Sequence, residues 1–547
     1  MSDEVLLGDE AVALGAIHAG LTAAYAYPGT PSTELLEYLL SYAAVHGSPH
    51  AAWCSNEKTA YEEALGVSFA SRRALVAMKH VGLNVAADPF INSALVAIKG
   101  GLVLVVADDP GMHSSQNEQD SRFYADFARI ICLEPANQQE AYEMTLEAFE
   151  LSERFEIPVM IRLVTRLAHS RSVVHLSGSR LQNSIAGTGD PTSWTLLPAN
   201  ARRRWRLLLE RQADFVSYAE NCAYNSLKLN ETDRTLGIIT TGLAKNYFLE
   251  NLGDLKTLPS HLHIGAYPLP VEKIRRLATH VDRVLVLEEG QPFLERQLRG
   301  IVSPPVEIEG KECGILPPDG ELTPDIVREA LGLRIREGVS LPGLSLPRRP
   351  PQLCAGCPHA DSFHALKIAL EAFPEAVVTS DIGCYTLGAF PPFCAIQSCV
   401  CMGASIGMAK GASEAGLKPA IAVIGDSTFL HSGVTGLVDA VAADTDMTLI
   451  ILDNETVAMT GGQPTILPSS RLEKLILGLG VRPEYFQLLN AHRKLNSRNA
   501  EIIGNAIAHE GLSVIVMARE CVETARRKPK IRKQETEPEA STTEVSR

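Results

Sequence analysis

The chain has 547 residues, of which 46% are apolar and 21% are charged, and its formal net charge is −14. A chain of this length is too long for one hydrophobic core and indicates about three domains. The excess of acidic residues favours solubility and argues against the basic surface that nucleic acid requires. No apolar run reaches the roughly 18 residues of a membrane-spanning helix, and residues 1–20 lack a secretory signal. We therefore expect a cytoplasmic protein that binds neither nucleic acid nor membrane.

Residues 1–180 alternate between helical and strand patterns, which predicts an α/β domain with a parallel sheet. Strands are expected over 23–27, 74–78, 101–107 and 158–163, and helices over 10–17, 57–70 and 138–155. Five polar residues are expected in loops that follow these strands, namely Thr30, Lys79, His80, Asn84 and His113. Such side chains could hold the carboxylate and carbonyl of a 2-oxo acid, although any one of them is more simply a polar loop residue.

The middle of the chain begins with the less regular residues 181–230, which are interpreted as a linker. A basic amphipathic helix over 199–215 is expected on the surface of this linker, and a solvated helix face is favoured over a binding patch. A second α/β domain follows over 231–340, with strands near 236–242 and 284–290. Because it shows no catalytic cluster, we assign it to support and subunit contact.

The Pro-rich residues 341–351 are interpreted as a second linker, and a last α/β domain is expected over 352–521. Within this domain, short apolar runs at 420–424 and 447–452 indicate two buried strands separated by a helix. Residues 522–547 become basic, then acidic and rich in Ser and Thr, which predicts a disordered tail.

Polar residues follow both buried strands of the last domain. Asp426 comes directly after the first strand and Asn454 after the second. Because parallel strands deliver their carboxyl ends to one edge of a sheet, both side chains are expected where such sheets bind ligands. With the carbonyl of Thr456 they would form an oxygen site suited to Mg²⁺ and a diphosphate. The simpler alternative is an ordinary αβ unit with polar loops.

This layout resembles the thiamine diphosphate signature, in which Gly-Asp-Gly is followed about thirty residues later by Asn; Ser427 stands here in place of the third Gly. The backbone amides of Gly425 and of the Gly383 and Gly403 loops are expected to hold the phosphates, because exposed N–H groups at helix starts favour anions. Ser427, Cys384 and Cys401 are expected to border the same cofactor site.

A carboxyl group that protonates the aminopyrimidine ring of this cofactor needs a raised pKa, which an apolar, closed site supplies. Glu57 is the candidate, because it begins a predicted helix after an apolar approach. An equally simple interpretation is a first-turn Glu that interacts favourably with the helix dipole.

Six of the 11 cysteines lie between positions 354 and 401. Cys354, Cys357 and Cys384 supply three soft ligands, and Cys521, after the last predicted strand, could be the fourth. Four thiolates suit zinc or an iron–sulfur cluster. Because these cysteines alternate along the chain with the predicted cofactor-binding segments, an electron acceptor is favoured over structural zinc. Cys394, Cys399 and Cys401 are interpreted as core or near-cofactor residues.

With these residues assembled, about residues 5–520 resemble the large subunit of the indolepyruvate ferredoxin oxidoreductases, a branch of the thiamine-dependent 2-oxoacid:ferredoxin oxidoreductases. The segments that carry the resemblance are Tyr27–Ser32, Met78–Asn84, His113–Glu118, Cys354–His359, Asp381–Gly388 and Cys401–Ser405. The resemblance implies two thiamine diphosphate-binding parallel-sheet domains that flank an α/β domain similar to the C-terminal domain of transketolase.

The resemblance also implies an activity, namely oxidative decarboxylation of an aryl pyruvate with coenzyme A to an acyl-CoA. It implies Glu57 as the ring-activating acid and Thr30 as a substrate contact, and we place His113 beside Thr30. The implied Mg²⁺ ligands are Asp426, Asn454 and Thr456, and the implied ligands of one 4Fe-4S cluster are Cys354, Cys357, Cys384 and Cys521. A smaller partner subunit, a ferredoxin as acceptor and a dimer of heterodimers are expected.

One feature departs from this family, whose large subunit usually ends in a two-cluster ferredoxin domain with dense Cys-x-x-Cys runs. No such run follows Cys521, so the electrons are expected to leave through another subunit or an external acceptor. Two alternatives stay open: a non-oxidative thiamine-dependent decarboxylase or carboligase, and a non-catalytic scaffold subunit.

Overall fold

The computed structural model describes residues 3–187, 189–338, 343 and 351–528. By its internal contacts the chain divides into two compact units, Met1–Pro347 and Arg348–Arg547. Each unit is described by itself. In the described residues, no helix is both long and apolar enough to cross a membrane.

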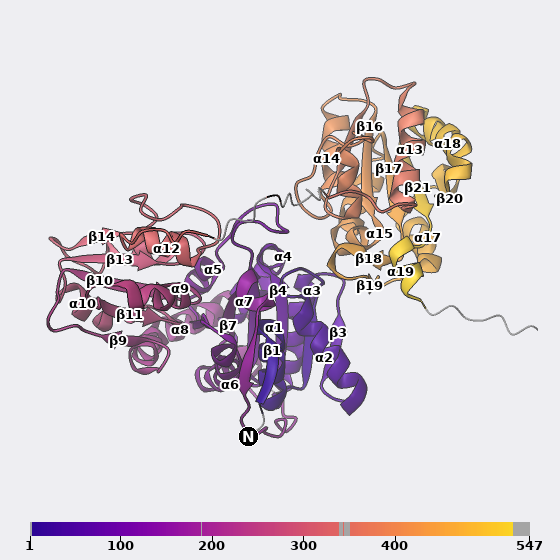
Figure 1. Ribbon diagram of the computed structural model, residues 1–547. Helices are drawn as coiled ribbons and strands as arrows, with labels where there is room; N and C mark the ends of the chain where they lie inside the picture. The colour runs from indigo at the N-terminus through magenta and orange to yellow at the C-terminus, as the bar shows by residue number, and fades with distance from the viewer. Residues whose placement is uncertain (1–2, 188, 339–342, 344–350, 529–547) are drawn as a thin grey trace, which may run out of the picture. The chain divides into compact units, whose positions relative to one another are not determined.

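A seven-stranded sheet forms the centre of the first unit, with the strand order β12-β6-β7-β5-β4-β2-β3 (Figure 1). All neighbours are parallel except β12, which pairs antiparallel with β6. The central strands are apolar and buried on both faces, as helix-covered parallel sheets require. The strands are β2 (Ala23–Ala26), β3 (His50–Trp53), β4 (Ala74–Lys79), β5 (Leu102–Asp108), β6 (Cys132–Leu133), β7 (Val159–Val164) and β12 (Ala266–Tyr267).

Helices on both faces cover this sheet, and α1 packs along α6 (Figure 1). They are α1 (Gly8–His18), α2 (Thr33–His46), α3 (Glu57–Phe69), α4 (His80–Ser93), α5 (Arg122–Ala128), α6 (Gln138–Phe155) and α7 (Thr165–His169). A separate antiparallel pair joins β1 (Asp3–Leu7) to β8 (Arg171–His175), which the sequence analysis did not predict.

A second sheet of the first unit has five strands in the order β14-β13-β10-β11-β9, and β9 alone is antiparallel. Its strands are β9 (Ser226–Lys228), β10 (Leu236–Thr241), β11 (Ser260–Ile264), β13 (Arg283–Leu287) and β14 (Glu307–Glu309). The helices of this part of the chain are α8 (Pro198–Asn221), α9 (Ala244–Asn251), α10 (Val271–Ala278), α11 (Phe293–Leu298) and α12 (Pro324–Ala330).

A buried ionic network joins the two sheets of the first unit. The Arg162 Nε of β7 lies 2.6 Å from an Asp108 carboxylate oxygen, and Arg162 Nη1 lies 2.5 Å from Glu134. Arg122 pairs with the nearby Asp120, just before α5. Its Nη1 also lies 3.1 Å from Oε2 of Glu288, the residue after β13. All of these side chains are buried, so each carboxylate there has a guanidinium partner inside the protein.

The second unit has one five-stranded, fully parallel sheet with the order β15-β16-β17-β21-β20. Alternate residues of β16 face opposite layers. Ile421 and Val423 contact the layer of α13 and α18, whereas Ala422 and Ile424 contact the layer of α14 and α16. The strands are β15 (Val377–Ser380), β16 (Ala420–Gly425), β17 (Met447–Asp453), β20 (Phe486–Asn490) and β21 (Leu512–Ala518), with a small antiparallel pair β18 (Thr456–Val457) and β19 (Gln463–Pro464).

The helices of the second unit are α13 (Pro358–Leu370), α14 (Ala404–Glu414), α15 (Asp426–Thr428), α16 (Val434–Ala442), α17 (Ser469–Gly478), α18 (Asn496–Ala508) and α19 (Val522–Arg527). The last of these corrects the sequence analysis, which placed the start of a disordered tail at residue 522. Arg527 at the end of α19 donates to the Gly461 carbonyl at 2.7 Å, which gives the helix a contact outside itself. Residues 529–547 of the predicted tail lie outside the described residues.

Two further expectations about local structure were wrong. The residues His80 and Asn84 belong to helix α4 rather than to a loop. The predicted surface helix over 199–215 is part of the longer α8, and Leu208 and Phe215 are buried against the core of the first unit. The amphipathic pattern therefore belongs to a helix that packs its apolar face against the core, as amphipathic helices of globular proteins usually do.

Candidate functional site

The carboxyl edge of the sheet in the second unit brings together the residues predicted to hold a cation. Strands β16 and β17 are parallel and Gly425 lies opposite Leu452, so Asp426 and Asn454 follow neighbouring strands at the same edge. Both side chains are buried. The Glu455 amide donates to Asp426 Oδ2 at 2.9 Å, and the Thr456 amide donates to Asn454 Oδ1 at 3.1 Å. These two bonds hold the segment after β17, which carries Asn454 and Thr456, against Asp426 at the end of β16.

A second carboxyl group, that of Asp453, lies beside Asp426. Burial raises the pKa of Asp426 well above its usual range, and the neighbouring Asp453 raises this pKa further. The Oδ2 atom of Asp453 is buried and has no hydrogen-bond partner. Two adjacent buried carboxyl groups without a basic side chain are costly unless a cation is present. The donors at this edge therefore fit a hard divalent ion.

The imidazole of His359 in α13 orients the Asn454 amide, a contact that the sequence analysis missed. Nε2 of His359 lies 3.0 Å from the Asn454 Nδ2. Burial lowers the pKa of His359 to about 4, and Arg519 acts in the same direction, so the ring is neutral and can accept a hydrogen bond. This contact leaves the Asn454 oxygen directed to the Thr456 amide. His359 lies within the segment Cys354–His359 that carries the resemblance, which was the available signal.

Tyr385 packs tightly against two of the glycines predicted to border the phosphates. A Cβ on Gly383 would lie 2.2 Å from the Tyr385 ring, and a Cβ on Gly425 would lie 2.5 Å from it. Gly403 has a φ of +83°, and a Cβ there would lie 2.6 Å from Ser432. These close approaches explain why glycine is needed at these positions. The Gly383 amide donates to Thr386 Oγ1 at 3.1 Å.

The loops of Gly383 and Gly403 are held together by a buried acid that the sequence analysis did not single out. Asp381 accepts from the Ser405 hydroxyl at 2.6 Å and from the Tyr385 hydroxyl. Burial raises the pKa of Asp381 to about 6. Ser427 lies in the short helical turn α15, after which a π-turn at Phe429–Gly433 leads into α16. Such π-turns are frequent at functional sites.

The structure brings the four predicted cluster cysteines into one region. The Cys357 amide donates to the Cys354 carbonyl at 3.0 Å, and the Cys521 amide donates to the Asn454 carbonyl at 3.1 Å. Burial raises the pKa of Cys384 to about 12, and the charges of Cys357, Cys521 and Cys354 raise this pKa further. Four thiols close enough to influence one another need a cationic centre to ionise together.

The spacing of these sulfur atoms is informative. In the described residues, no three of the four lie within 4.8 Å of one another. Tetrahedral zinc with Zn–S bonds of about 2.3 Å requires sulfur atoms only about 3.8 Å apart. Cys394, Cys399 and Cys401 are exposed, which excludes the core interpretation and leaves the near-cofactor interpretation. Cys399 lies near Cys401 and Asp381.

In the first unit, the Glu57 carboxyl is buried at the start of α3. Asn56 caps this helix by accepting from the Thr59 amide at 2.8 Å. Helix α4 passes directly over the Glu57 side chain, because a Cβ on Gly82 would lie 2.6 Å from Glu57 Oε1. Glycine at position 82 therefore allows two helices to enclose the carboxyl group.

Three of the five residues predicted at the substrate end are linked by the loop after β5. Lys79 Nζ donates to the Ser114 carbonyl at 2.8 Å, and Ser114 Oγ lies 3.3 Å from the Thr30 carbonyl. His80 Nε2 lies 3.3 Å from the Asn117 carbonyl. Burial lowers the pKa of Lys79 to about 8 and also lowers the pKa of His80. The Lys79 ammonium is thus buried, and its pKa is lowered but still leaves it mostly charged at pH 7.

The other two residues point elsewhere. Asn84 Oδ1 accepts from the Tyr124 hydroxyl at 2.6 Å. His113 is exposed, and its Nε2 lies 3.2 Å from Glu321 Oε2. His113 directly precedes Ser114, which contacts Lys79 and Thr30, but the imidazole itself faces Glu321.

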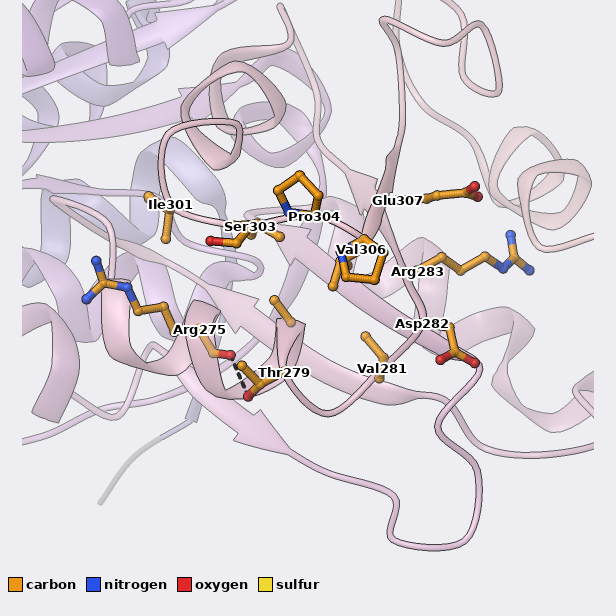
Figure 2. A pocket seen from close by; sticks show the side chains of 13 residues that line it. Arg275, Thr279, Val281, Asp282, Arg283, Ile301, Ser303, Pro304, Val306 and Glu307 are labelled. Atoms are coloured by element: carbon orange, nitrogen blue, oxygen red, sulfur yellow. Dashed lines mark hydrogen bonds between the residues drawn. The ribbon is translucent and has the colours of Figure 1, made fainter.

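A cavity of about 830 Å³ lies elsewhere in the first unit, at the amino-terminal edge of the five-stranded sheet (Figure 2). Arg283 and Glu307, the first residues of β13 and β14, line it together with Arg275 and Pro304. Arg283 is paired with Glu309 at 2.6 Å and Arg275 with Glu272 at 2.7 Å. None of the predicted site residues lines this cavity, so the carboxyl edges carry the candidate site.

Two protein-family models match the chain. The thiamine diphosphate-binding model of pyruvate flavodoxin/ferredoxin oxidoreductases matches residues 14–195, and the C-terminal TPP-binding domain of thiamine pyrophosphate enzymes matches residues 381–517. These matches confirm the predicted class, in which two thiamine diphosphate-binding parallel-sheet domains flank a further α/β domain.

Several proteins of known name are similar to the chain over most of its length. Indolepyruvate oxidoreductase subunit IorA of Archaeoglobus fulgidus is 38% identical over 94% of this chain and 86% of its own. The subunit of the same name from Methanothermobacter thermautotrophicus is 36% identical over 94% of this chain and 86% of its own. That from Thermococcus kodakarensis is 39% identical over 84% of this chain and 76% of its own. A solved 2-oxoglutarate:ferredoxin oxidoreductase from Magnetococcus marinus aligns with 60% of this chain and 65% of its own at 18% identity and a TM-score of 0.49.

Proposed function

We propose that the chain decarboxylates an aryl pyruvate such as indolepyruvate with coenzyme A, because it belongs to the family of the indolepyruvate oxidoreductase subunit IorA. Members of this family are thiamine-dependent 2-oxoacid oxidoreductases. The products are an acyl-CoA, carbon dioxide and two electrons. The observation that carries this proposal is the carboxyl edge, where Asp426 and Asn454 follow adjacent strands and the Cys521 amide is bonded to Asn454.

The residues at this edge fit Mg²⁺ and a diphosphate. Asp426, Asn454 and the Thr456 carbonyl would hold the cation, and the backbone amides near Gly383, Gly403 and Gly425 would bind phosphate oxygens. When bound, thiamine diphosphate supplies the carbanion chemistry that 2-oxo acid decarboxylation needs. His359 keeps the Asn454 oxygen available, and Ser427, Cys384 and Cys401 border the region.

Glu57 is proposed to hold the proton that activates the cofactor ring. It is buried and enclosed by α3 and α4, which supports this proposal because the carboxyl group is held in one place and shielded from solvent. Thr30 and His113 are proposed to contact the substrate, with the Lys79 ammonium nearby as a counter-charge for its carboxylate. Of these, Thr30 and Lys79 are already linked through Ser114, whereas His113 would have to leave Glu321.

The thiolates of Cys354, Cys357, Cys384 and Cys521 are proposed to hold one 4Fe-4S cluster, for which four thiolates are the usual ligands. The mutual influence of these thiols supports this proposal. Electrons would pass from there to ferredoxin or to another electron-accepting subunit. The relatives are named as subunits, which supports a smaller partner subunit. We propose a dimer of heterodimers.

The test is anaerobic co-purification of the chain with its partner, followed by quantitation of iron, sulfide and thiamine diphosphate. We expect about four iron atoms per chain and reduction of a viologen dye that depends on both indolepyruvate and coenzyme A. Cys521→Ser should lower the iron content and the dye reduction, whereas the exposed Cys394→Ser should lower neither. A complex that releases carbon dioxide without reducing any acceptor, or that holds zinc in place of iron, contradicts the proposal.

A further inference from the structure

Three ionisable side chains converge at one corner of the first unit, outside the site described above. Asp9 lies in the first turn of α1, Glu34 in the first turn of α2, and His169 is the last residue of α7. One ligand atom from each lies within 4.8 Å of the other two. His169 Nε2 and Glu34 Oε2 are 3.3 Å apart. The consecutive helices α1 and α2 and the distant helix α7 therefore present two carboxylates and one imidazole to a common point.

Asp9 is the unusual member of this group. Its side chain is 0% exposed, and neither of its carboxylate oxygens has a hydrogen-bond partner. Among the described residues, no other carboxyl group has two buried oxygens that both lack a hydrogen-bond partner. Burial raises the pKa of Asp9 well above its usual range, Glu34 raises this pKa further, and the nearby Leu35 amide offsets only part of the rise. A buried carboxylate with so little compensation is costly unless a cation or proton balances it.

The imidazole of His169 is already oriented toward this point. Its hydrogen bond to Glu34 raises the pKa of His169, and a further hydrogen bond to the Pro31 carbonyl acts in the same direction. An imidazole that is hydrogen-bonded to a backbone carbonyl while its other nitrogen faces carboxylates has the usual arrangement of a metal-binding histidine.

The backbone that carries the three residues is closely packed. A Cβ on Gly8 would lie 2.3 Å from the Leu167 carbonyl oxygen, so α1 and α7 are in direct backbone contact. The Leu7 amide donates to Glu10 Oε2 at 2.8 Å and holds the start of α1. The Gly29 amide donates to Thr33 Oγ1 at 3.1 Å and holds the start of α2. The convergence of the side chains thus follows from the fold and not from flexible surface contacts.

We propose that Asp9, Glu34 and His169 bind one divalent first-row transition-metal ion that fastens α1, α2 and α7 together. Two carboxylates neutralise a charge of +2, and the neutral imidazole adds a ligand that zinc and manganese accept. Metal–ligand bonds of about 2.0–2.2 Å allow ligand separations up to about 4.4 Å. The His169–Glu34 separation of 3.3 Å lies within this limit, and the 4.8 Å that bounds the whole group exceeds it by only a few tenths of an ångström.

The ion has a route of entry and a consequence for its surroundings. The side chains of Glu34 and His169 are 37% and 34% exposed, so solvent reaches one side of the group and can complete the coordination. Glu34 and the Pro31 carbonyl flank the turn that carries Thr30. An ion at this point would therefore rigidify the base of that turn, whatever the substrate is.

Mn²⁺ is the probe for the test, because its free form is counted by EPR. The full-length chain, stripped with chelator, is titrated with Mn²⁺ and compared with Asp9→Asn and His169→Gln. Both variants keep Asp426, Asn454 and the cysteines, so any binding at those residues is common to all samples. His175→Gln is the matched control, because His175 is also exposed but pairs with one carboxylate alone, Asp3, at 2.8 Å.

We expect the wild type and His175→Gln to bind one more equivalent of Mn²⁺ than Asp9→Asn and His169→Gln. The additional ion should show nitrogen coupling in pulsed EPR, and this coupling should be absent from His169→Gln. It should also raise the Tm of the wild type but not that of His169→Gln, which tests the site even if Asp9→Asn does not fold. Equal Mn²⁺ stoichiometry in all folded samples, or an additional ion without nitrogen coupling, overturns the proposal.

Discussion

Two groups of buried carboxyl side chains in this molecule differ in how their charge is compensated. In the first unit, Asp108, Asp120 and Glu134 contact the guanidinium groups of Arg122 and Arg162. In the second unit, Asp426 and Asp453 lie side by side, and Asp453 keeps a buried oxygen without a partner. The charges of the first group are balanced by guanidinium groups within the chain, although Asp108 Oδ1 also has no hydrogen-bond partner. The second group has no ion pair among the described residues, so a cation or a proton must compensate it. Buried acids without an internal basic partner therefore point to function, whereas paired ones point to stability.

The largest expected effect concerns Glu57, which extends the comparison to an acid proposed to move a proton. Replacing Glu57 with Gln keeps the side-chain volume beneath Gly82 but removes the acid. We expect activity to fall by about 10²–10⁴-fold, with little change in Tm. The measurement is the rate of acceptor reduction by the complex. Glu62→Gln, on the exposed side of the same helix, should keep full activity. A fully active Glu57→Gln complex would instead support a scaffold role.

Arg162→Met tests the paired group. Removing this guanidinium leaves the Asp108 and Glu134 carboxylates buried without their cation. We expect the free energy of unfolding of the first unit to fall by about 3–5 kcal/mol. The matched control is Arg166→Met, whose side chain is 43% exposed and pairs with Glu321, and which should cost at most about 1 kcal/mol. Urea unfolding measures both, and equal losses would remove the distinction between the two groups.

Asp426→Asn tests the unpaired group, where we expect no loss of stability, in contrast to Arg162→Met. The amide relieves the proximity of two carboxyl groups, so we expect the cofactor-free protein to be at least as stable as the wild type. Binding of Mg²⁺ and thiamine diphosphate should weaken by about 100-fold or more, because a ligand contributes at least as much as the second-shell groups around it. Calorimetry measures the binding, and the exposed Asp439→Asn in α16 serves as control. Strong destabilisation without loss of binding would contradict the comparison.

The smallest expected effect is a pH dependence within the paired group. Burial raises the pKa of Glu289 to about 7. Because the folded-state pKa exceeds the unfolded value, the folded protein binds the additional proton, and stability falls as pH rises toward and through 7. The contribution of Glu289 should decrease by about 1.4 kcal/mol between pH 6 and pH 8. In Glu289→Gln, which can still accept from the Leu322 amide, this part of the slope should disappear. Parallel stability curves for the two proteins would contradict the assignment.

The sequence predicted the strands that carry Asp426 and Asn454 because buried parallel strands are short apolar runs with polar residues at their ends. It did not predict Asp453 as a neighbour of Asp426 or His359 as a partner of Asn454, because these contacts arise only when separate loops meet. Helix α4 was missed because Gly82 and Pro89 are poor helix formers. The glycine is needed there for the close approach to Glu57, so a requirement of the site outweighed local propensity.

The peptide group that follows Asn454 has a consequence for how the two parts of the proposed reaction communicate. Its carbonyl accepts from the Cys521 amide, while the side chain of the same residue faces the ion-binding oxygens. Asn454 thus connects a proposed Mg²⁺ ligand, through its side chain, to the backbone of a proposed cluster ligand, through its carbonyl. Under the proposed roles, a small backbone rotation at Asn454 when the cluster is reduced would shift the side-chain oxygen that holds the cation. The position of the diphosphate would then change without any domain movement.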